Sequence, residues 1–214
     1  FGPKPQNFYD ILKIGDLIYL QDSAPGKTLD QLPEAEVAFI ASNPSTGAIL
    51  SYQGGFNFSK SNFDRVKQSF PQAGSSFKPF IYSAAIANGY KASDTINDAP
   101  IIFEDKNLES AWRPENYTGK FYGPIRLREA LIQSVNIVSI KLLRELGIDK
   151  AHTFLENFGF PKSRLAPDLS LALGSSSFSP AEMIRAYNFL ANSGEGKNLY
   201  FIEKIIDRDN NIIF

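Results

Sequence analysis

The sequence predicts a mixed α and β domain, and three observations along the chain support this fold class. Two short apolar runs, residues 37–41 and 48–53, flank the turn sequence Asn-Pro-Ser-Thr-Gly at residues 43–47, which is typical of a β-hairpin. A block of segments with apolar residues at helical spacing follows between residues 77 and 193. New apolar runs begin at residue 199. Strands, then helices, then further strands indicate a mixed domain whose sheet is completed by later residues.

The first residues are expected to lie outside this domain. Residues 11–21 form a short apolar segment interrupted by Gly15 and Asp16, and residues 22–33 are polar with a turn at Pro25 and Gly26. We therefore expect residues 1–33 to be an N-terminal remnant or linker, and residues 34–214 to form the main domain, incomplete at its C-terminus. Within that domain, residues 37–41 are expected to be a buried strand.

The helical block is expected to begin near residue 75. Apolar residues recur at helical spacing from Phe77 to Ala85, and Asn88 with Gly89 is typical of a helix C-terminus. We expect residues 91–123 to be a long polar and aromatic loop. Helices are predicted for residues 125–132, 137–146 and 149–159, because their apolar positions have helical spacing and glycines follow the last two.

The last helix has a clear start signal. Ser179 is expected to be its N-cap, Pro180 its first residue and Glu182 the capping-box partner, and the helix is expected to stop at Gly194. Residues 199–206 and 212–214 are expected to form a terminal hairpin.

The composition excludes several classes of function. The chain has 214 residues, of which 43% are hydrophobic, and its formal net charge of −1 gives no bulk attraction to nucleic acid or to an anionic membrane. It has no cysteine and a single histidine, which excludes a disulfide framework and a multi-histidine metal site. We expect that histidine, His152, to lie at the surface. No apolar run is long enough to span a bilayer.

Ser75 and Lys78 are the first candidate catalytic residues. Pro79 is tolerated only in the first turn of a helix, so the helix must begin close to Ser75. Ser75 and Lys78 then lie one turn apart at the positive end of the helix dipole. A serine hydroxyl needs a base to become nucleophilic, and a desolvated lysine can serve. Taken alone, the pattern also fits a capped helix whose lysine reaches solvent.

Ser134 and Asn136 are the second candidate pair. They lie between two predicted helices with one residue between them, so their side chains can point the same way from a turn. The serine can relay a proton to a leaving nitrogen, and the asparagine amide can hold a substrate carbonyl. An ordinary break between helices has the same sequence pattern, but the two motifs in this order are more specific than either alone.

Together these motifs resemble the active-site set of penicillin-binding proteins and serine β-lactamases, Ser-x-x-Lys, Ser-x-Asn and Lys-Thr-Gly. The wider match is to class A penicillin-binding proteins and covers residues 36–214. The similar blocks are Asn-Pro-Ser-Thr-Gly-Ala-Ile-Leu at residues 43–50, Gly-Ser-Ser-Phe-Lys-Pro-Phe at 74–80, Gly-Pro-Ile-Arg-Leu-Arg-Glu-Ala-Leu at 123–131 and Leu-Ala-Leu-Gly at 171–174. Residues 1–33 match less distinctly and resemble the edge of a domain that some 1A-type members insert.

The resemblance implies a penicillin-binding or β-lactamase-like fold, with helices packed on an antiparallel sheet, and a DD-transpeptidase or carboxypeptidase reaction. Ser75 would attack a peptidoglycan stem peptide ending in D-Ala-D-Ala, Lys78 would take its proton, Ser134 would help deliver it, and Asn136 would bind substrate. β-Lactams would acylate Ser75. No cofactor, metal or nucleic acid is implied. The implied location is the periplasmic face of the inner membrane, with membrane contact only through segments absent from this chain.

One departure from the family pattern concerns the third motif. Neither Lys-Thr-Gly nor Lys-Ser-Gly occurs in the sequence, so a wall of the site and one oxyanion donor are expected to come from elsewhere. A class A β-lactamase is disfavoured because no Glu-x-x-x-Asn follows Asn136. A β-lactam-sensing domain and a non-catalytic fragment of the same fold remain alternatives.

The aromatic residues of the 91–123 loop have two interpretations. Trp112 and Tyr117 can form a wall of the substrate cleft, since this loop precedes the turn that carries Ser134. The alternative is that these rings pack the loop onto the domain.

Overall fold

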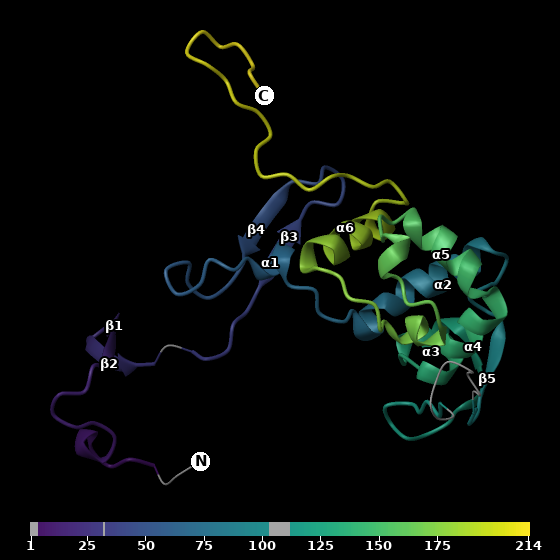
Figure 1. Cartoon of the computed structure of the whole chain (residues 1–214), viewed down its shortest axis with the longest axis horizontal. Coiled ribbons are helices and arrows are strands. Elements are labelled where there is room, and N and C mark those ends of the chain that lie inside the picture. The colour runs from purple at the N-terminus through teal and green to yellow at the C-terminus, as the bar shows by residue number, and fades with distance from the viewer. Residues whose placement is uncertain (1–3, 32, 103–111) are drawn as a thin grey trace. The chain divides into compact units, whose positions relative to one another are not determined.

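The computed structural model describes residues 4–31, 33–102 and 112–214, and the chain divides into two units, Phe1–Glu36 and Val37–Phe214. The first unit holds a 3-10 turn, η1 (Phe8–Asp10), and an antiparallel hairpin of β1 (Tyr19–Ser23) and β2 (Gly26–Asp30) (Figure 1). The expected turn at Pro25 and Gly26 joins these two strands, and the strand β2 itself was not predicted. Nine of the ten residues of these two strands are exposed, so no alternation of apolar and polar residues signals the pairing, which rests on backbone hydrogen bonds.

The predicted hairpin opens the second unit. β3 (Phe39–Ser42) and β4 (Ile49–Gln53) pair antiparallel, and the turn between them is confirmed, because the Gly47 N–H donates to the Asn43 carbonyl at 2.8 Å. Gly47 has φ +85°, and a Cβ there would overlap the backbone oxygen of Asn198. The expectation of a buried strand at residues 37–41 is wrong: β3 is exposed or half-buried, because the hairpin packs on α6 through one side.

Among the described residues, the core of this unit is built mainly by the helices α2 (Lys78–Ala87), α3 (Leu127–Ile132), α4 (Asn136–Leu146), α5 (Ile148–Glu156) and α6 (Pro180–Ala191). Figure 1 shows α2 among the other helices, and six of its ten residues are buried. A cluster of aromatic rings holds this packing together, with Phe77, Phe80, Phe160 and Phe178 in contact at centroid distances of 4.5 to 5.7 Å. Such burial of apolar area is the main stabilising term in folding.

Local helix signals in the sequence are confirmed. Ser179 caps α6, and its side chain and that of Glu182 form the reciprocal capping box. The helix ends at Ala191, three residues before the expected stop at Gly194. Gly147 separates α4 from α5.

The expected loop at residues 91–123 contains a strand. β5 (Thr95–Asp98) pairs antiparallel with β6 (Gly123–Arg126), which also replaces the first residues of the helix predicted at 125–132. Neither strand is longer than four residues, and the pairing closes across more than twenty residues, so no local pattern marks it. Residues 103–111 of this predicted loop lie outside the described residues.

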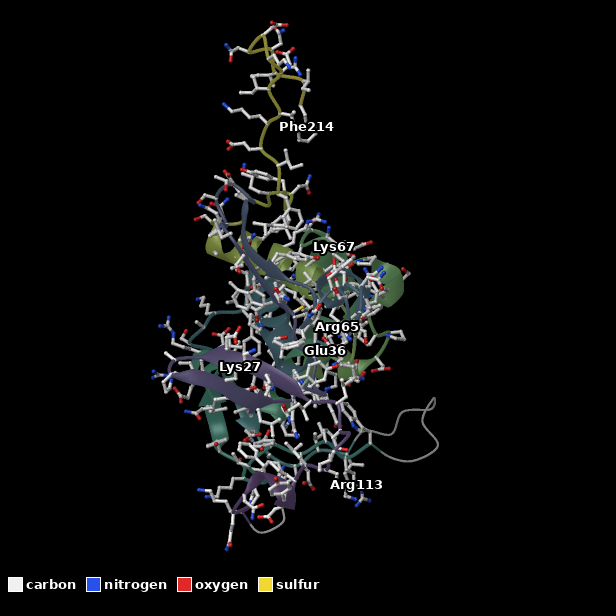
Figure 2. All side chains as sticks on the ribbon, turned by 90° about the vertical axis from the view of Figure 1, so that its left-hand side faces the viewer. Lys27, Glu36, Arg65, Lys67, Arg113 and Phe214 are labelled. Carbon is white, nitrogen blue, oxygen red and sulfur yellow. The ribbon has the colours of Figure 1, made fainter. Side chains whose placement is uncertain are left out.

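A short helix and the C-terminal segment complete the unit. α1 (Arg65–Gln68) carries Arg65 and Lys67, both labelled in Figure 2, and Nζ of Lys67 lies 5.4 Å from the ring centroid of Phe201. At the predicted terminal hairpin, a single antiparallel bridge joins Ile206 to Ile212. None of the helices in the described residues combines the length and apolar character needed to cross a bilayer.

Candidate active site

Ser75 lies at the entry to the buried helix. A 3-10 turn, η2 (Gly74–Phe77), leads directly into α2, and Pro79 is the second residue of that helix. This confirms that the helix begins close to Ser75. The Ser75 side chain is exposed, whereas Lys78, one turn later, is completely buried. The helix start therefore presents an accessible hydroxyl above a desolvated amine.

Lys78 is held by three oxygen atoms. Its Nζ donates to the Ser134 carbonyl at 2.6 Å, to Ser134 Oγ at 3.0 Å and to Asn136 Oδ1 at 2.7 Å. All three acceptors are neutral, and burial lowers the pKa of Lys78 to about 8. Near neutral pH the unprotonated fraction of this amine is therefore much larger than that of an ordinary lysine, and only the unprotonated amine can accept a proton.

The turn between α3 and α4 brings Ser134 and Asn136 to the same side. The Ser134 N–H donates to Leu131 O at 3.0 Å and the Val135 N–H to Ala130 O at 2.8 Å. Ser134 itself has φ +52°, a conformation that a residue with a Cβ rarely adopts. The tight reversal directs both side chains at Lys78, as the motif spacing predicted. The contact of Ser75 with Lys78, and the roles of all four residues, stay predictions.

A second segment, which contains Gly174 and Ser176, is hydrogen-bonded to the backbone just before Ser75. Gly74 N–H donates to Gly174 O at 2.9 Å, and Ala73 N–H donates to Ser176 O at 3.0 Å. Gly174 has φ +73°, and a Cβ there would overlap backbone atoms of Gly74. Tyr187 of α6 also contacts this turn, because its Oη donates to Ser76 O at 2.6 Å. Gly174, the last residue of the Leu-Ala-Leu-Gly block at residues 171–174, therefore helps to hold the Ser75 turn in place. The sequence pattern did not indicate this role.

A cavity of about 320 Å³ joins Ser75 to the turn that carries Ser134 and Asn136. Its other residues are Gln133 and Val135 from that turn, and Asn116, Tyr117, Thr118 and Tyr122 from the segment before β6. The Tyr117 side chain is fully exposed. The Asn136 amide is already engaged, because its Nδ2 donates to the Glu115 carbonyl at 2.9 Å.

Trp112 does not line this cavity. It is half-buried and packs against the hydrophobic core. Of the two interpretations of the aromatic residues, packing therefore describes Trp112, and a cavity wall describes Tyr117. Asn116 was missed as a candidate, since an isolated asparagine in an irregular segment gives no signal.

His152 is buried, which corrects the expectation of a surface position. It is 5% exposed, and its Nε2 lies 2.9 Å from the Ala166 carbonyl. The imidazole fills a place in the core because one backbone oxygen satisfies its polar edge. Within the described residues, no group of three acidic or histidine side chains is arranged to hold a metal ion.

Comparison with known proteins matches residues 37–212 to the family described as penicillin binding protein transpeptidase domain. Penicillin-binding protein 1A of Pseudomonas aeruginosa is 45% identical over 214 residues, covering all of this chain and 26% of that protein. The chain spans about a quarter of the length of the curated relatives it matches.

Solved structures of penicillin-binding proteins also match this chain. The crystal structure of penicillin-binding protein 1A from Haemophilus influenzae matches 94% of this chain and 30% of that one, with a TM-score of 0.87 and 40% identity. PonA1 from Mycobacterium tuberculosis, solved in complex with penicillin V, matches 85% of this chain and 51% of its own, with a TM-score of 0.72 at 24% identity. These matches confirm the predicted mixed α and β fold.

Proposed function

Because this chain belongs to the penicillin-binding protein transpeptidase domain family, we propose that it provides the nucleophile, the base and the proton relay of a serine DD-transpeptidase that cross-links peptidoglycan. One observation carries the proposal. The buried Nζ of Lys78 contacts Ser134 Oγ and Asn136 Oδ1, and exposed Ser75 lies one turn earlier on a shared cavity. A desolvated amine beside a hydroxyl relay and an accessible serine is the arrangement that acyl transfer requires.

The first half of the reaction forms an ester. Ser75 Oγ bonds to the carbonyl carbon of the penultimate D-alanine, while its proton passes to neutral Lys78. The peptide C–N bond then breaks as Ser134 delivers that proton to the departing nitrogen. The products are an acyl group on Ser75 and free D-alanine.

The second half releases the ester. An amine from a neighbouring stem peptide attacks the acyl carbon and loses a proton, the C–O bond breaks, and Ser75 regains its hydrogen. Water in place of the amine gives a carboxypeptidase. A β-lactam reacts through its ring amide, and its nitrogen stays attached to the acyl group, so Ser75 remains blocked.

The proposed site needs two oxyanion donors and a positive charge for the substrate carboxylate. The Ser75 N–H is one of the donors. A strand with the sequence Lys-Thr-Gly, which this sequence does not contain, supplies the second donor and the positive charge. The proposed location is the periplasmic face of the bacterial inner membrane. The proposed domain boundaries are residues 1–33 for the linker or inserted-domain edge and 34–214 for the transpeptidase.

A β-lactam-sensing domain or a non-catalytic fragment of the same fold is the second candidate. A sensor would also be acylated on Ser75, so acylation alone does not separate it from an enzyme. The fully formed Lys78, Ser134 and Asn136 contacts favour the enzyme over the non-catalytic fragment.

The test uses the native protein that contains this sequence. A fluorescent penicillin should label it covalently, peptide mass mapping should place the label on Ser75, and Ser75→Ala should abolish it. Ser76→Ala is the matched control, because Ser76 is also exposed in the same turn. Release of D-alanine from a synthetic pentapeptide then separates enzyme from sensor. Labelling that survives Ser75→Ala would overturn the proposal.

A further inference from the structure

A buried pair of polar side chains, Asp98 and Asn116, lies next to the cavity, and Asn116 is one of the cavity's lining residues. Asp98, the last residue of β5, is 1% exposed, and Asn116 is 6% exposed. Asn116 Nδ2 donates to both carboxylate oxygens of Asp98, at 3.0 and 2.9 Å, and to Lys120 O at 2.9 Å. Asp98 Oδ2 also accepts from the Tyr122 N–H at 2.8 Å. A buried carboxylate is costly unless it is hydrogen-bonded in this way, so the pair has a fixed geometry.

The other side of Asn116 faces the start of α4. Its Oδ1 accepts from the Asn136 N–H at 3.0 Å and from the Ile137 N–H at 3.2 Å. The first N–H groups of a helix have no partner inside the helix, and Val135, the N-cap of α4, makes no side-chain cap bond. Asn116 therefore caps α4 from twenty residues away in the sequence.

Asn136, one of the two capped residues, also contacts Lys78. Asn136 donates its backbone N–H to Asn116 and its Nδ2 to Glu115 O, and its Oδ1 accepts from Lys78. Two neighbouring residues of one segment thus fix both the backbone and the amide of Asn136. The same segment presents Tyr117 to the cavity.

We propose that Asp98 and Asn116 are positioning residues for the reaction. Asp98 orients the Asn116 amide, and Asn116 sets where α4 begins, which places the Ser134 turn and Asn136 around Lys78. In this proposal neither residue contacts the reacting atoms. Both act by fixing the position of α4. The kinetic part of this inference rests on the proposed function, whereas the capping of α4 does not.

The orientation of the Asn116 amide makes the pair testable by exchange of the two residues. In Asn116→Asp, a second carboxylate faces Asp98, and the like charges repel. In the double variant Asp98→Asn/Asn116→Asp, the amide of the new residue at 98 donates to the carboxylate at 116, which still accepts from the first N–H groups of α4. Asn188→Ala is the control, because Asn188 is an equally buried asparagine, 5% exposed, whose side chain bonds to Ser42 of β3 and not to α4.

Two measurements on the native protein separate positioning from folding. The final amount of label on Ser75 counts folded sites, and the acylation rate per labelled site reports geometry. We expect Asn116→Asp to lower that rate by about 10- to 100-fold, the double variant to recover most of it, and Asn188→Ala to leave it unchanged. A wild-type rate for Asn116→Asp, or a double variant no faster than Asn116→Asp, overturns the positioning role.

Hydrogen exchange supplies a readout that needs no activity. The amides of Asn136 and Ile137 should exchange at least several-fold faster in Asn116→Ala than in wild type or Asn188→Ala, because they lose their acceptor. Unchanged exchange at these two amides overturns the capping even if Ser75 is labelled. Faster exchange in a protein that no penicillin labels supports the capping and rejects only the proposed function.

Discussion

Nζ of Lys78 lies 2.7 Å from Oδ1 of Asn136, a residue 58 positions later in the chain. The contact joins the Ser-x-x-Lys motif to the Ser-x-Asn motif. It also shows how a completely buried lysine is accommodated: neutral oxygens accept hydrogen bonds from its amine, while desolvation disfavours its charge.

The pH dependence of acylation follows from this setting. Lys78 must be neutral to accept the Ser75 proton, and its pKa is lowered to about 8, so the acylation rate should rise as pH increases through about 8 and then level off. Lys78→Arg should be inactive throughout, since a guanidinium stays protonated. Rates measured with a fluorescent penicillin between about pH 6 and 9.5 check this, and a rate that falls across that interval would count against Lys78 as the base.

Gly174→Ala should displace the Ser75 turn. Its new Cβ would overlap backbone atoms of Gly74, and φ is +73°, so we expect a loss of about 2 kcal/mol or more in stability together with slower acylation. Gly194→Ala is the control, because it has φ +90° and open space around it. It should cost stability only. Equal acylation rates in both variants would show that Gly174 does not position Ser75.

Tyr117 and Trp112 should respond differently to truncation. Tyr117 is exposed on the cavity and Trp112 packs on the core. Tyr117→Ala should weaken substrate or β-lactam binding by several-fold and leave the melting temperature nearly unchanged. Trp112→Ala should lower stability by about 2 kcal/mol, less than the loss typical of a fully buried aromatic residue, because Trp112 is half-buried. Thermal melts and acylation at several penicillin concentrations distinguish them, and the reverse pattern would refute both assignments.

Phe1–Phe214 by itself should react slowly with β-lactams. The sequence has no Lys-Thr-Gly strand, and loss of one oxyanion donor costs about 10²–10³ in rate. The comparison is between this chain alone and the native protein that contains it, with the rate expressed per folded molecule. Equal rates would mean that no residue outside these 214 completes the site.

The sequence by itself determined the features that depend on neighbouring residues. Pro79 placed the start of α2 near Ser75, and Ser179 with Glu182 placed the start of α6, because proline and capping side chains act on backbone groups within one turn. The order of motifs also indicated the family, since Ser75, Lys78, Ser134 and Asn136 are few but specific.

Only the tertiary structure decided which distant groups meet. The packing of α2 on α4 buries Lys78 and lowers its pKa, the pairing of β5 with β6 brings Asp98 to Asn116, and the core encloses His152. Desolvation depends on all the atoms around a group, and hydrogen bonds between residues far apart depend on the whole fold. A pattern over a few neighbouring positions contains neither desolvation nor long-range hydrogen bonds. For this reason no sequence pattern indicated that Asn116 caps α4.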